Sequence, residues 1–161
     1  MDKQLEKLIQ DQVKNEWYSA YLYLSMAAWF ESQNFEGFAH WMYKQAAEEQ
    51  AHGRKMFDFL LDRGVRVTLQ AISQPPVDFA SPLEVFEKAY EHEQKVTALI
   101  NGIADQAEKV NDHPTKVFIQ WFISEQVEEE KNASRVVDLL KKIPASSGAI
   151  YQLDHQLGKR E

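Results

Sequence analysis

The stretch that decides the fold is "AAEEQAHGRK", residues 46–55, because it places charged side chains where a helix should be apolar. The segment around it, residues 36–63, has apolar residues at three- and four-residue steps, which predicts a helix. Glu49 and His52 share the buried stripe of that helix with Phe38. A single Glu-x-x-His on a helix is usually solvated surface. Its meaning therefore depends on what the rest of the chain places beside it.

Composition limits the classes of protein that this chain can represent. The 161 residues are enough for one domain, 1–161, and the net charge of -7 argues against nucleic-acid binding. There is no cysteine, so disulfides and thiolate metal sites are excluded. The N-terminus lacks a signal peptide's apolar core, and the longest uncharged run, residues 17–30, is too short to span a bilayer. We expect a cytoplasmic protein with no membrane partner.

Periodicity and the few Gly and Pro residues predict five helices, over about 3–32, 36–63, 82–110, 113–142 and 147–157. The third helix has the clearest start, with Ser81 as N-cap, Pro82 at the first helical position and Glu84 closing a capping box. Gly64 ends the second helix. The fold class is therefore all-α.

The connections between the helices set the topology. The first and third connections are short, so they join the helices into two antiparallel hairpins. The second connection, residues 64–80, is long. Fully extended, those residues reach roughly 55 Å, and the helix before them is about 42 Å long. The connection can therefore run the length of the bundle and leave the second and third helices parallel. We expect a four-helix bundle with one long crossover and a short C-terminal fifth helix.

Each of the four long helices carries metal-capable residues on its buried stripe: Glu16 on the first, Glu49 and His52 on the second, Glu93 on the third, Gln126 and Glu129 on the fourth. Residues at equal height in an antiparallel hairpin have their mean position at the turn. The mean of 16 and 49 is 32.5, inside the turn segment "SQNFEG" (32–37), and the mean of 93 and 126 is 109.5, at the edge of "VNDHP" (110–114). The two sets also repeat at one offset, because 93 − 16, 126 − 49 and 129 − 52 are all 77.

Such a layer of buried carboxylates predicts bound cations. An unpaired buried carboxylate costs several kcal/mol, and several at one level repel one another. The four stripes hold no Lys or Arg to compensate. Carboxylates with one imidazole suit iron or manganese and tolerate zinc. The pattern is not His-Glu-x-x-His, so a zinc protease has little support. Gln126 could be an ordinary buried amide, but its place in the pattern favours contact with the metal ions or with their ligands.

The chain resembles the bacterial non-haem ferritins over essentially its whole length. The motifs "NEWYSAYLYLSM" (15–26), "EEQAHGRK" (48–55), "YEHEQKV" (90–96) and "SEQVEEE" (124–130) occur in the family's order and spacing. The resemblance implies a ferritin-like bundle and a cage of 24 identical subunits. It also implies a ferroxidase centre in each bundle, and iron stored in the cage as a ferric oxide mineral.

The resemblance also implies roles for individual residues. It makes Glu16, Glu49 and His52 ligands of a first iron, and it makes Glu49 the bridge to a second iron held by Glu93 and Glu129. A third iron site towards the inner surface would consist of Glu48, Glu125, Glu128 and a share of Glu129. Gln126 would be the oxygen-handling residue, and Tyr23 would lie near the centre, with Trp121 close by.

The implied activity is oxidation of Fe(II), with dioxygen or hydrogen peroxide as the electron acceptor. One alternative is a di-iron peroxidase or oxygenase with no storage role. Another is a non-catalytic helical binding module, which would leave the buried carboxylates unexplained. Gln50 and Ala51 fill the gap where bacterioferritins carry a haem-ligating Met, so no haem is expected. Apolar residues beyond the needs of one small bundle favour a homo-oligomer: Trp17, Tyr21, Trp29 and Phe79.

Overall fold

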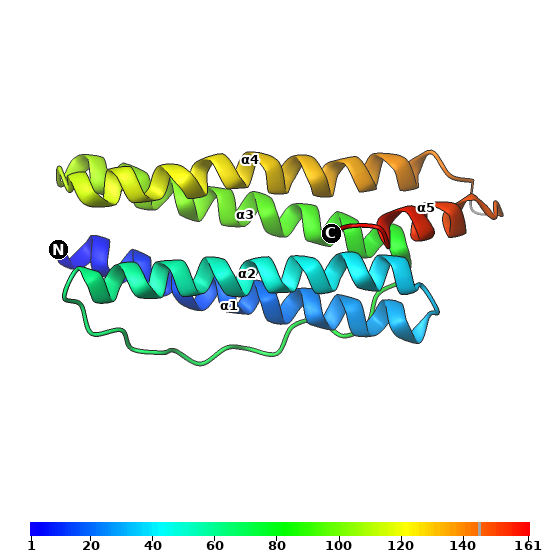
Figure 1. The fold of residues 1–161 in the computed structure, drawn as a ribbon, viewed down its shortest axis with the longest axis horizontal. Helices are drawn as coiled ribbons and strands as arrows, with labels where there is room; N and C mark the ends of the chain where they lie inside the picture. The colour runs from blue at the N-terminus through cyan, green and yellow to red at the C-terminus, as the bar shows by residue number, and fades with distance from the viewer. Residues whose placement is uncertain (145) are drawn as a thin grey trace.

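The computed structural model describes residues 1–144 and 146–161 as an all-α structure with five helices. The helices are α1 (Lys3–Ser32), α2 (Glu36–Asp62), α3 (Pro82–Lys109), α4 (His113–Lys141) and α5 (Ala149–Leu157). The first four lie side by side as a bundle, with α5 at one end (Figure 1). The expected fold class is confirmed. Helices α2, α3 and α4 end one residue earlier than predicted, and α5 begins two residues later.

Three of the helices end in the same backbone turn. Asn34, Gly64 and Asn111 follow α1, α2 and α3 with φ of 61°, 72° and 56°. After α2, the N–H of Val65 donates to the carbonyl of Leu60 at 2.9 Å, which is the Schellman arrangement of a helix C-terminus. Only the glycine was predicted from the sequence. Asparagine also tolerates the left-handed conformation, and it serves the same purpose at the other two turns.

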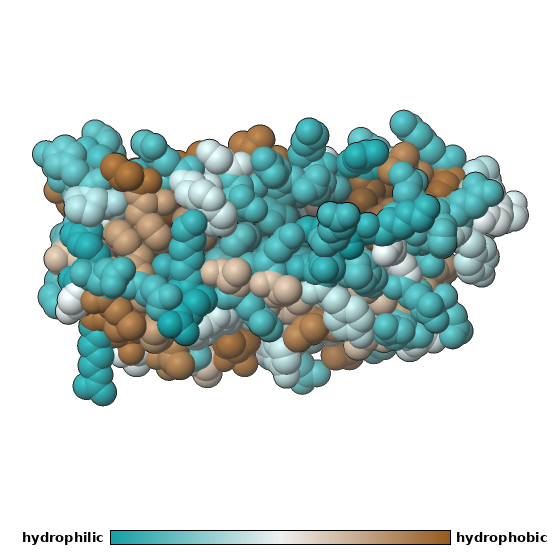
Figure 2. Space-filling view, viewed as in Figure 1, coloured by the Kyte–Doolittle hydropathy of each residue, from teal (hydrophilic) through white to brown (hydrophobic). Residues whose placement is uncertain are grey.

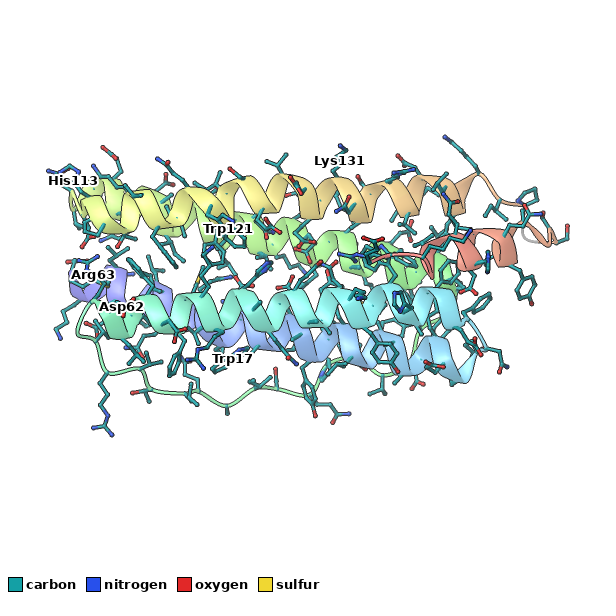
Figure 3. All side chains as sticks on the ribbon, viewed as in Figure 1. Trp17, Asp62, Arg63, His113, Trp121 and Lys131 are labelled. Atoms are coloured by element: carbon teal, nitrogen blue, oxygen red, sulfur yellow. The ribbon has the colours of Figure 1, made fainter. Side chains whose placement is uncertain are left out.

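The helix N-termini are held by side chains. Ser81 accepts from the N–H of Glu84, as predicted, but the Glu84 carboxylate reaches the N–H of Ala80 and not that of Ser81, so the capping box is shifted by one residue. Asp112 accepts from the N–H of Thr115 at the start of α4. The same carboxylate pairs with both terminal nitrogens of Arg63, at 2.8 and 2.9 Å. This pair ties the end of α2 to the start of α4. Arg63 and His113, the first residue of α4, lie at the same end of the bundle in Figure 3.

The crossover between α2 and α3 runs along the outside of α1, as its length predicted (Figure 1). Its successive contacts follow α1 from one end towards the other. The N–H of Thr68 donates to Gln10, and later Ser25 donates to the carbonyl of Pro76. Helices α2 and α3 consequently run parallel, and the two hairpins α1–α2 and α3–α4 pack against each other.

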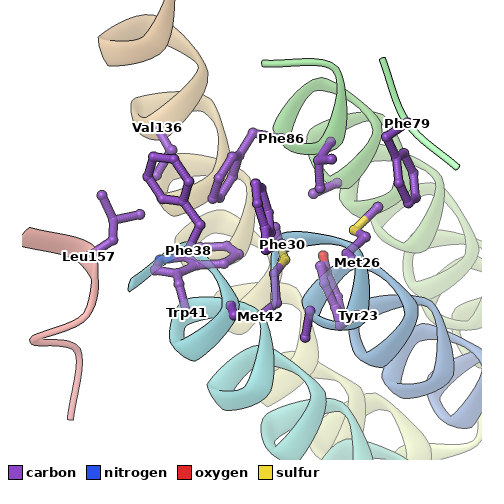
Figure 4. Packing of buried hydrophobic residues seen from close by; sticks show 14 of the residues in the cluster. Tyr23, Met26, Phe30, Phe38, Trp41, Met42, Phe79, Phe86, Val136 and Leu157 are labelled. Atoms are coloured by element: carbon purple, nitrogen blue, oxygen red, sulfur yellow. The ribbon is translucent and has the colours of Figure 1, made fainter. Parts of the chain in front are cut away.

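Two apolar clusters fill the bundle, one towards each end. The cluster near α5 is rich in aromatic rings, with Phe30, Phe38 and Phe86 within 5.7 Å of one another by ring centroids (Figure 4). The cluster at the other end is mostly aliphatic, with residues such as Leu5 and Ile100. The buried polar residues separate these clusters. The fold therefore isolates a polar layer between two dry regions.

Not all of the apolar residues expected to exceed the needs of one bundle lie at the surface. Trp29 and Phe79 pack on each other within the chain, with ring centroids 5.8 Å apart, so they are not surplus. Tyr21 is 51% exposed. Apolar atoms also show along the lower edge of the molecule, where the crossover runs (Figure 2), and the crossover exposes Leu69 and Val77. Within the described ranges, none of the helices has the length and apolar character needed to cross a membrane.

Candidate metal centre

The polar layer lies between the two hairpins near the middle of the bundle, where carboxylate oxygens gather (Figure 3). Six of the residues predicted for the site are buried there, each at most 4% exposed: Glu16, Glu49, His52, Glu93, Gln126 and Glu129. They come from all four long helices. The equal heights expected from the turn positions are therefore found.

The first hairpin supplies one compact group of possible ligands. One atom each from Glu16, Glu49 and His52 lies within 4.8 Å of the others. The Nδ1 atom of His52 is 3.9 Å from Glu16 Oε2 and 3.7 Å from Glu49 Oε2. Residues three apart on a helix share a face, which is why Glu49 and His52 converge on one point.

A second group combines the two hairpins. Oxygens of Glu49, Glu93 and Glu129 also lie within 4.8 Å of one another, and all three residues are buried. Glu49 belongs to both groups, which gives it the position of a bridge between two cations. Two ligand groups that share one carboxylate suit a pair of metal ions.

Each buried carboxylate of the first hairpin leaves one oxygen without a partner. In the described part of the chain, the only buried side-chain oxygens or nitrogens without a hydrogen bond are Glu16 Oε2 and Glu49 Oε1. Burial raises the pKa of Glu16 well above its usual range, and the Glu49 carboxylate adds to the effect. Burial, followed by Glu93, does the same to the pKa of Glu49. Two orphaned oxygens in a dry layer fit a cation that would complete them.

The second hairpin's carboxylates have partners. Tyr23 donates its hydroxyl to Glu93, and Gln126 Nε2 donates to the same carboxylate at 3.2 Å. Burial raises the pKa of Glu93 to about 7, against these two hydrogen bonds, which lower it. The pKa of Glu129 is raised to about 8, by burial first and by Glu93 second. Gln45 donates to Glu129.

Two buried amides at the site were not predicted. Gln12 Nε2 donates to Glu16 Oε1 at 2.8 Å, and Gln45 holds Glu129. Both are at most 1% exposed. Their signal in the sequence was their place on the buried stripes, four residues before Glu16 and four before Glu49. Such amides fix the orientation of carboxylates that would bind metal.

The three outer carboxylates are less closely grouped than the resemblance implied. Glu125 forms a group with His52 and Glu129, and its Oε1 is 3.9 Å from His52 Nε2. Glu48 points to a different partner, Arg160, at 2.5 Å. Glu128 is exposed and belongs to none of the three ligand groups found among the described residues.

Two aromatic neighbours border the site. The Trp121 ring lies edge-on to His52, with centroids 5.4 Å apart, and the ammonium group of Lys55 sits 3.4 Å from the centre of that ring. His92 adjoins Glu93 in sequence but bonds Ser19 at 2.7 Å, on the neighbouring face. Burial lowers the pKa of His92 to about 4, which makes it a neutral structural residue at ordinary pH.

The chain is similar to known proteins over its whole length. A family model described as a ferritin-like domain matches residues 6–143. A bacterial non-heme ferritin of Bacteroides fragilis is 40% identical over 160 residues, covering 99% of both chains. A Staphylococcus aureus protein of the same description is 36% identical, covering 99% of this chain and 96% of its own. The crystal structure of an open pore ferritin from Archaeoglobus fulgidus superposes with a TM-score of 0.98 at 42% identity, covering 100% of this chain and 98% of that one.

Proposed function

The chain belongs to the ferritin family, and on that premise we propose that it stores iron by oxidising Fe(II) at the centre between its hairpins. The Fe(III) formed is kept as a ferric oxide mineral inside a homo-oligomeric cage. The observation that carries this function is Glu49, a buried carboxylate shared by two ligand groups and left with an unpartnered oxygen. Iron is a substrate and cargo here, not a resident cofactor.

The two ligand groups divide the substrate ions between them. Glu16, Glu49 and His52 would hold one Fe(II), and Glu49, Glu93 and Glu129 the other. Binding ionises carboxyl groups whose pKa is raised without metal, so protons leave the site as Fe(II) enters. The positive charge of the iron ions replaces that of the released protons and relieves the repulsion among the ionised carboxylates.

The reaction is a two-electron oxidation. Each Fe(II) gives up one electron, and one dioxygen takes both with two protons to become hydrogen peroxide. Hydrogen peroxide can instead take the two electrons and two protons, giving two waters. The protein's own contribution is geometric: Tyr23 and Gln126 hold the Glu93 carboxylate, and Gln45 holds Glu129. Gln126 is also our candidate for contact with the oxidant beside the second ion.

The oxidation test removes a ligand of each kind. Replacing either Glu49 or His52 with Ala should abolish the fast phase of Fe(II) oxidation followed by stopped-flow absorbance. Glu91→Ala is the matched control, because Glu91 is an exposed carboxylate on α3. Equal rates in the parent and in both site variants would refute the centre. Binding of no Fe(II) at all would favour the helical binding module.

A third iron site is the finer part of the proposal. Glu125 already lies with His52 and Glu129, and a 100° helical step keeps Glu125 and Glu128 from converging on the first two ions. With Glu48, they would hold iron on its way inward. The double change of Glu125 and Glu128 to Ala should spare the first two ions and alter the iron oxidised per dioxygen. Loss of the first two ions, or an unchanged ratio, would show that no third site exists there.

We propose a cage of 24 subunits as the assembly. The relatives named above are ferritins over nearly the full length of this chain, and exposed apolar residues on α1 and the crossover, such as Tyr21, Leu24 and Ile72, offer a surface to bury. Light scattering of the purified protein gives the mass directly. A monomer or dimer that oxidises Fe(II) without retaining mineral would favour a peroxidase or oxygenase with no storage role.

A further inference from the structure

The last residues of the chain turn back from α5 along α2, towards the middle of the bundle (Figure 1). Two glycines allow α5 to lie this close. A Cβ on Gly37 would stand 1.7 Å from the carbonyl oxygen of Asp154, and a Cβ on Gly158 would stand 3.2 Å from the Cα of Gly37. The Asp154 carboxylate accepts from the N–H of Phe38 at 2.8 Å, in the first turn of α2. The start of the tail is therefore fixed on α2.

The tail carries an arginine, Arg160, that is held on several sides. Arg160 Nη2 is 2.5 Å from the Glu48 carboxylate, and its Nη1 donates to Gln45 Oε1 at 2.9 Å. Its guanidinium lies 4.7 Å from the centre of the Trp41 ring, and its backbone carbonyl is 2.6 Å from His40 Nε2. The side chain is only 20% exposed. These contacts make a specific binding site for one cationic group.

The side-chain amide of Gln45 connects this binding site to the metal centre. Gln45 accepts from Arg160 through its oxygen and donates to Glu129 through its nitrogen. Because a guanidinium only donates, it can bind only the oxygen end of the amide, which turns the nitrogen end towards Glu129. The four buried stripes contain no Lys or Arg, so the tail brings to this layer a positive charge that they lack.

We propose that Arg160 is a built-in counter-ion of Glu48, which competes with iron at the third site and orients Gln45 on Glu129. This inference rests on the proposed function, because it presumes that Glu48 receives iron. The guanidinium occupies Glu48 Oε2 and places a positive charge beside that carboxylate, so it repels an arriving ion and Arg160 weakens the third site. Arg160 is a positioning residue, since it acts through Glu48 and Gln45.

The competition can be measured without any oxidation. Fe(II) is titrated into the assembled, metal-free protein under anaerobic conditions, and calorimetry resolves the successive ions. Arg160→Ala should tighten binding of the third ion by about fivefold, the range expected for releasing one partly exposed charge pair. Lys159→Ala removes an exposed positive charge from the adjacent position and should leave that affinity unchanged. Arg160→Lys restores the charge and should bring the affinity back towards the parent value.

A double-mutant comparison assigns the effect to Glu48. In Glu48→Ala, the further change Arg160→Ala should no longer tighten binding of the third ion, because the carboxylate for which Arg160 competes is gone. If Arg160→Ala still tightens the third ion in the absence of Glu48, Arg160 does not act as the counter-ion of Glu48. The proposal is also wrong if Arg160→Ala alone leaves the affinity for the third ion unchanged. Arg160→Lys, which should keep the parent's thermal unfolding and mass, is the folding control for that result. If Glu48→Ala binds the third ion like the parent, both the third site and the counter-ion are wrong. A parent that binds no Fe(II) at the first two positions would instead overturn the proposed function.

Discussion

The two hairpins carry the same polar pattern 77 residues apart, yet they satisfy it differently. In α1–α2, Glu16 and Glu49 each keep an oxygen with no partner. In α3–α4, Glu93 is held by Tyr23 and Gln126, so its carboxylate is complete without metal. One half of the site is therefore poised for a cation, and the other half is stable without one.

This difference shows how a pseudosymmetric site can distinguish two identical ions. A carboxylate whose oxygens lack donors gains more from a cation than one that must give up hydrogen bonds to bind it. We therefore expect the first Fe(II) to enter beside Glu16, Glu49 and His52. The second then enters a site where Glu49 is already ionised.

The largest expected effect tests this order directly. His52→Ala should weaken binding of the first Fe(II) by about a hundredfold, because it removes a ligand from the half whose two carboxylates each keep an unpaired oxygen. Glu93→Ala should leave the first ion nearly unaffected and weaken the second. Anaerobic titration calorimetry separates the two events. If both variants weaken the first ion equally, the halves are equivalent and the comparison fails.

The pH dependence of stability tests the charge cost of the layer. Glu93 and Glu129, with pKa values of about 7 and 8 in the folded protein, bind more protons folded than unfolded, so their stabilising contribution is lost as pH rises through those values. His92, with a pKa of about 4, has the opposite slope up to its ordinary 6.5. The melting temperature of metal-free protein should therefore fall between pH 6.5 and 8, on the order of 5 °C.

Zinc supplies the control for that decline, because it binds such ligands without redox chemistry. With saturating Zn(II), the carboxylates stay ionised and paired, and the melting temperature should no longer fall over that range. Differential scanning fluorimetry at several pH values gives both curves. Parallel curves with and without zinc would mean that the decline comes from elsewhere in the protein.

A smaller effect separates the halves in the absence of metal. Glu49→Gln should stabilise the metal-free protein by about 2 kcal/mol at pH 7, because a neutral amide replaces an acid that folding forces to take up a proton. The gain should disappear near pH 4.5, where the unfolded acid is also protonated. Glu93→Gln should gain less, since Tyr23 and Gln126 already stabilise that carboxylate. Urea unfolding at both pH values measures this, and an equal gain in the two variants would contradict the comparison.

The smallest expected effect is on the stability of the metal-free protein and concerns Tyr23, whose hydroxyl donates to Glu93. Tyr23→Phe removes one buried hydrogen bond to Glu93 and should destabilise the metal-free protein by about 1 kcal/mol. Tyr151→Phe, at a ring that is 64% exposed, should change nothing measurable and serves as the control. Unfolding by urea is again sufficient. A Tyr23→Phe protein as stable as the control would mean that Glu93 finds another donor.

Much of this molecule could be predicted because its signals are local. Helix periods, the cap at Ser81 and the turn at Gly64 each depend on a few neighbouring residues, and they gave helix bounds within two residues. The heights of the site residues followed from counting along two antiparallel helices. Burial of the six central residues was thus predictable before any contact was known.

The rest depends on distances between segments far apart in sequence. Arg160 reaches Glu48 across 112 positions, and no periodicity marks such a contact. Trp29 and Phe79 seemed surplus because nothing in the sequence shows that the crossover folds back on α1. The partners of Glu16 and Glu93 were equally hidden, since the repeat of 77 suggests symmetry where the hydrogen bonds differ.

The long crossover also determines when the site comes into existence during folding. Each hairpin closes through a short turn, so we expect its contacts to form before those that span the crossover. The crossover adds little to the entropy of bringing the hairpins together, because that cost grows only with the logarithm of loop length. Docking of the second hairpin on the first is therefore the event that buries Glu93 and Glu129 against Glu49. The repulsion among these acids is felt at that late step, and a metal ion already held by the first hairpin would speed the last stage of assembly.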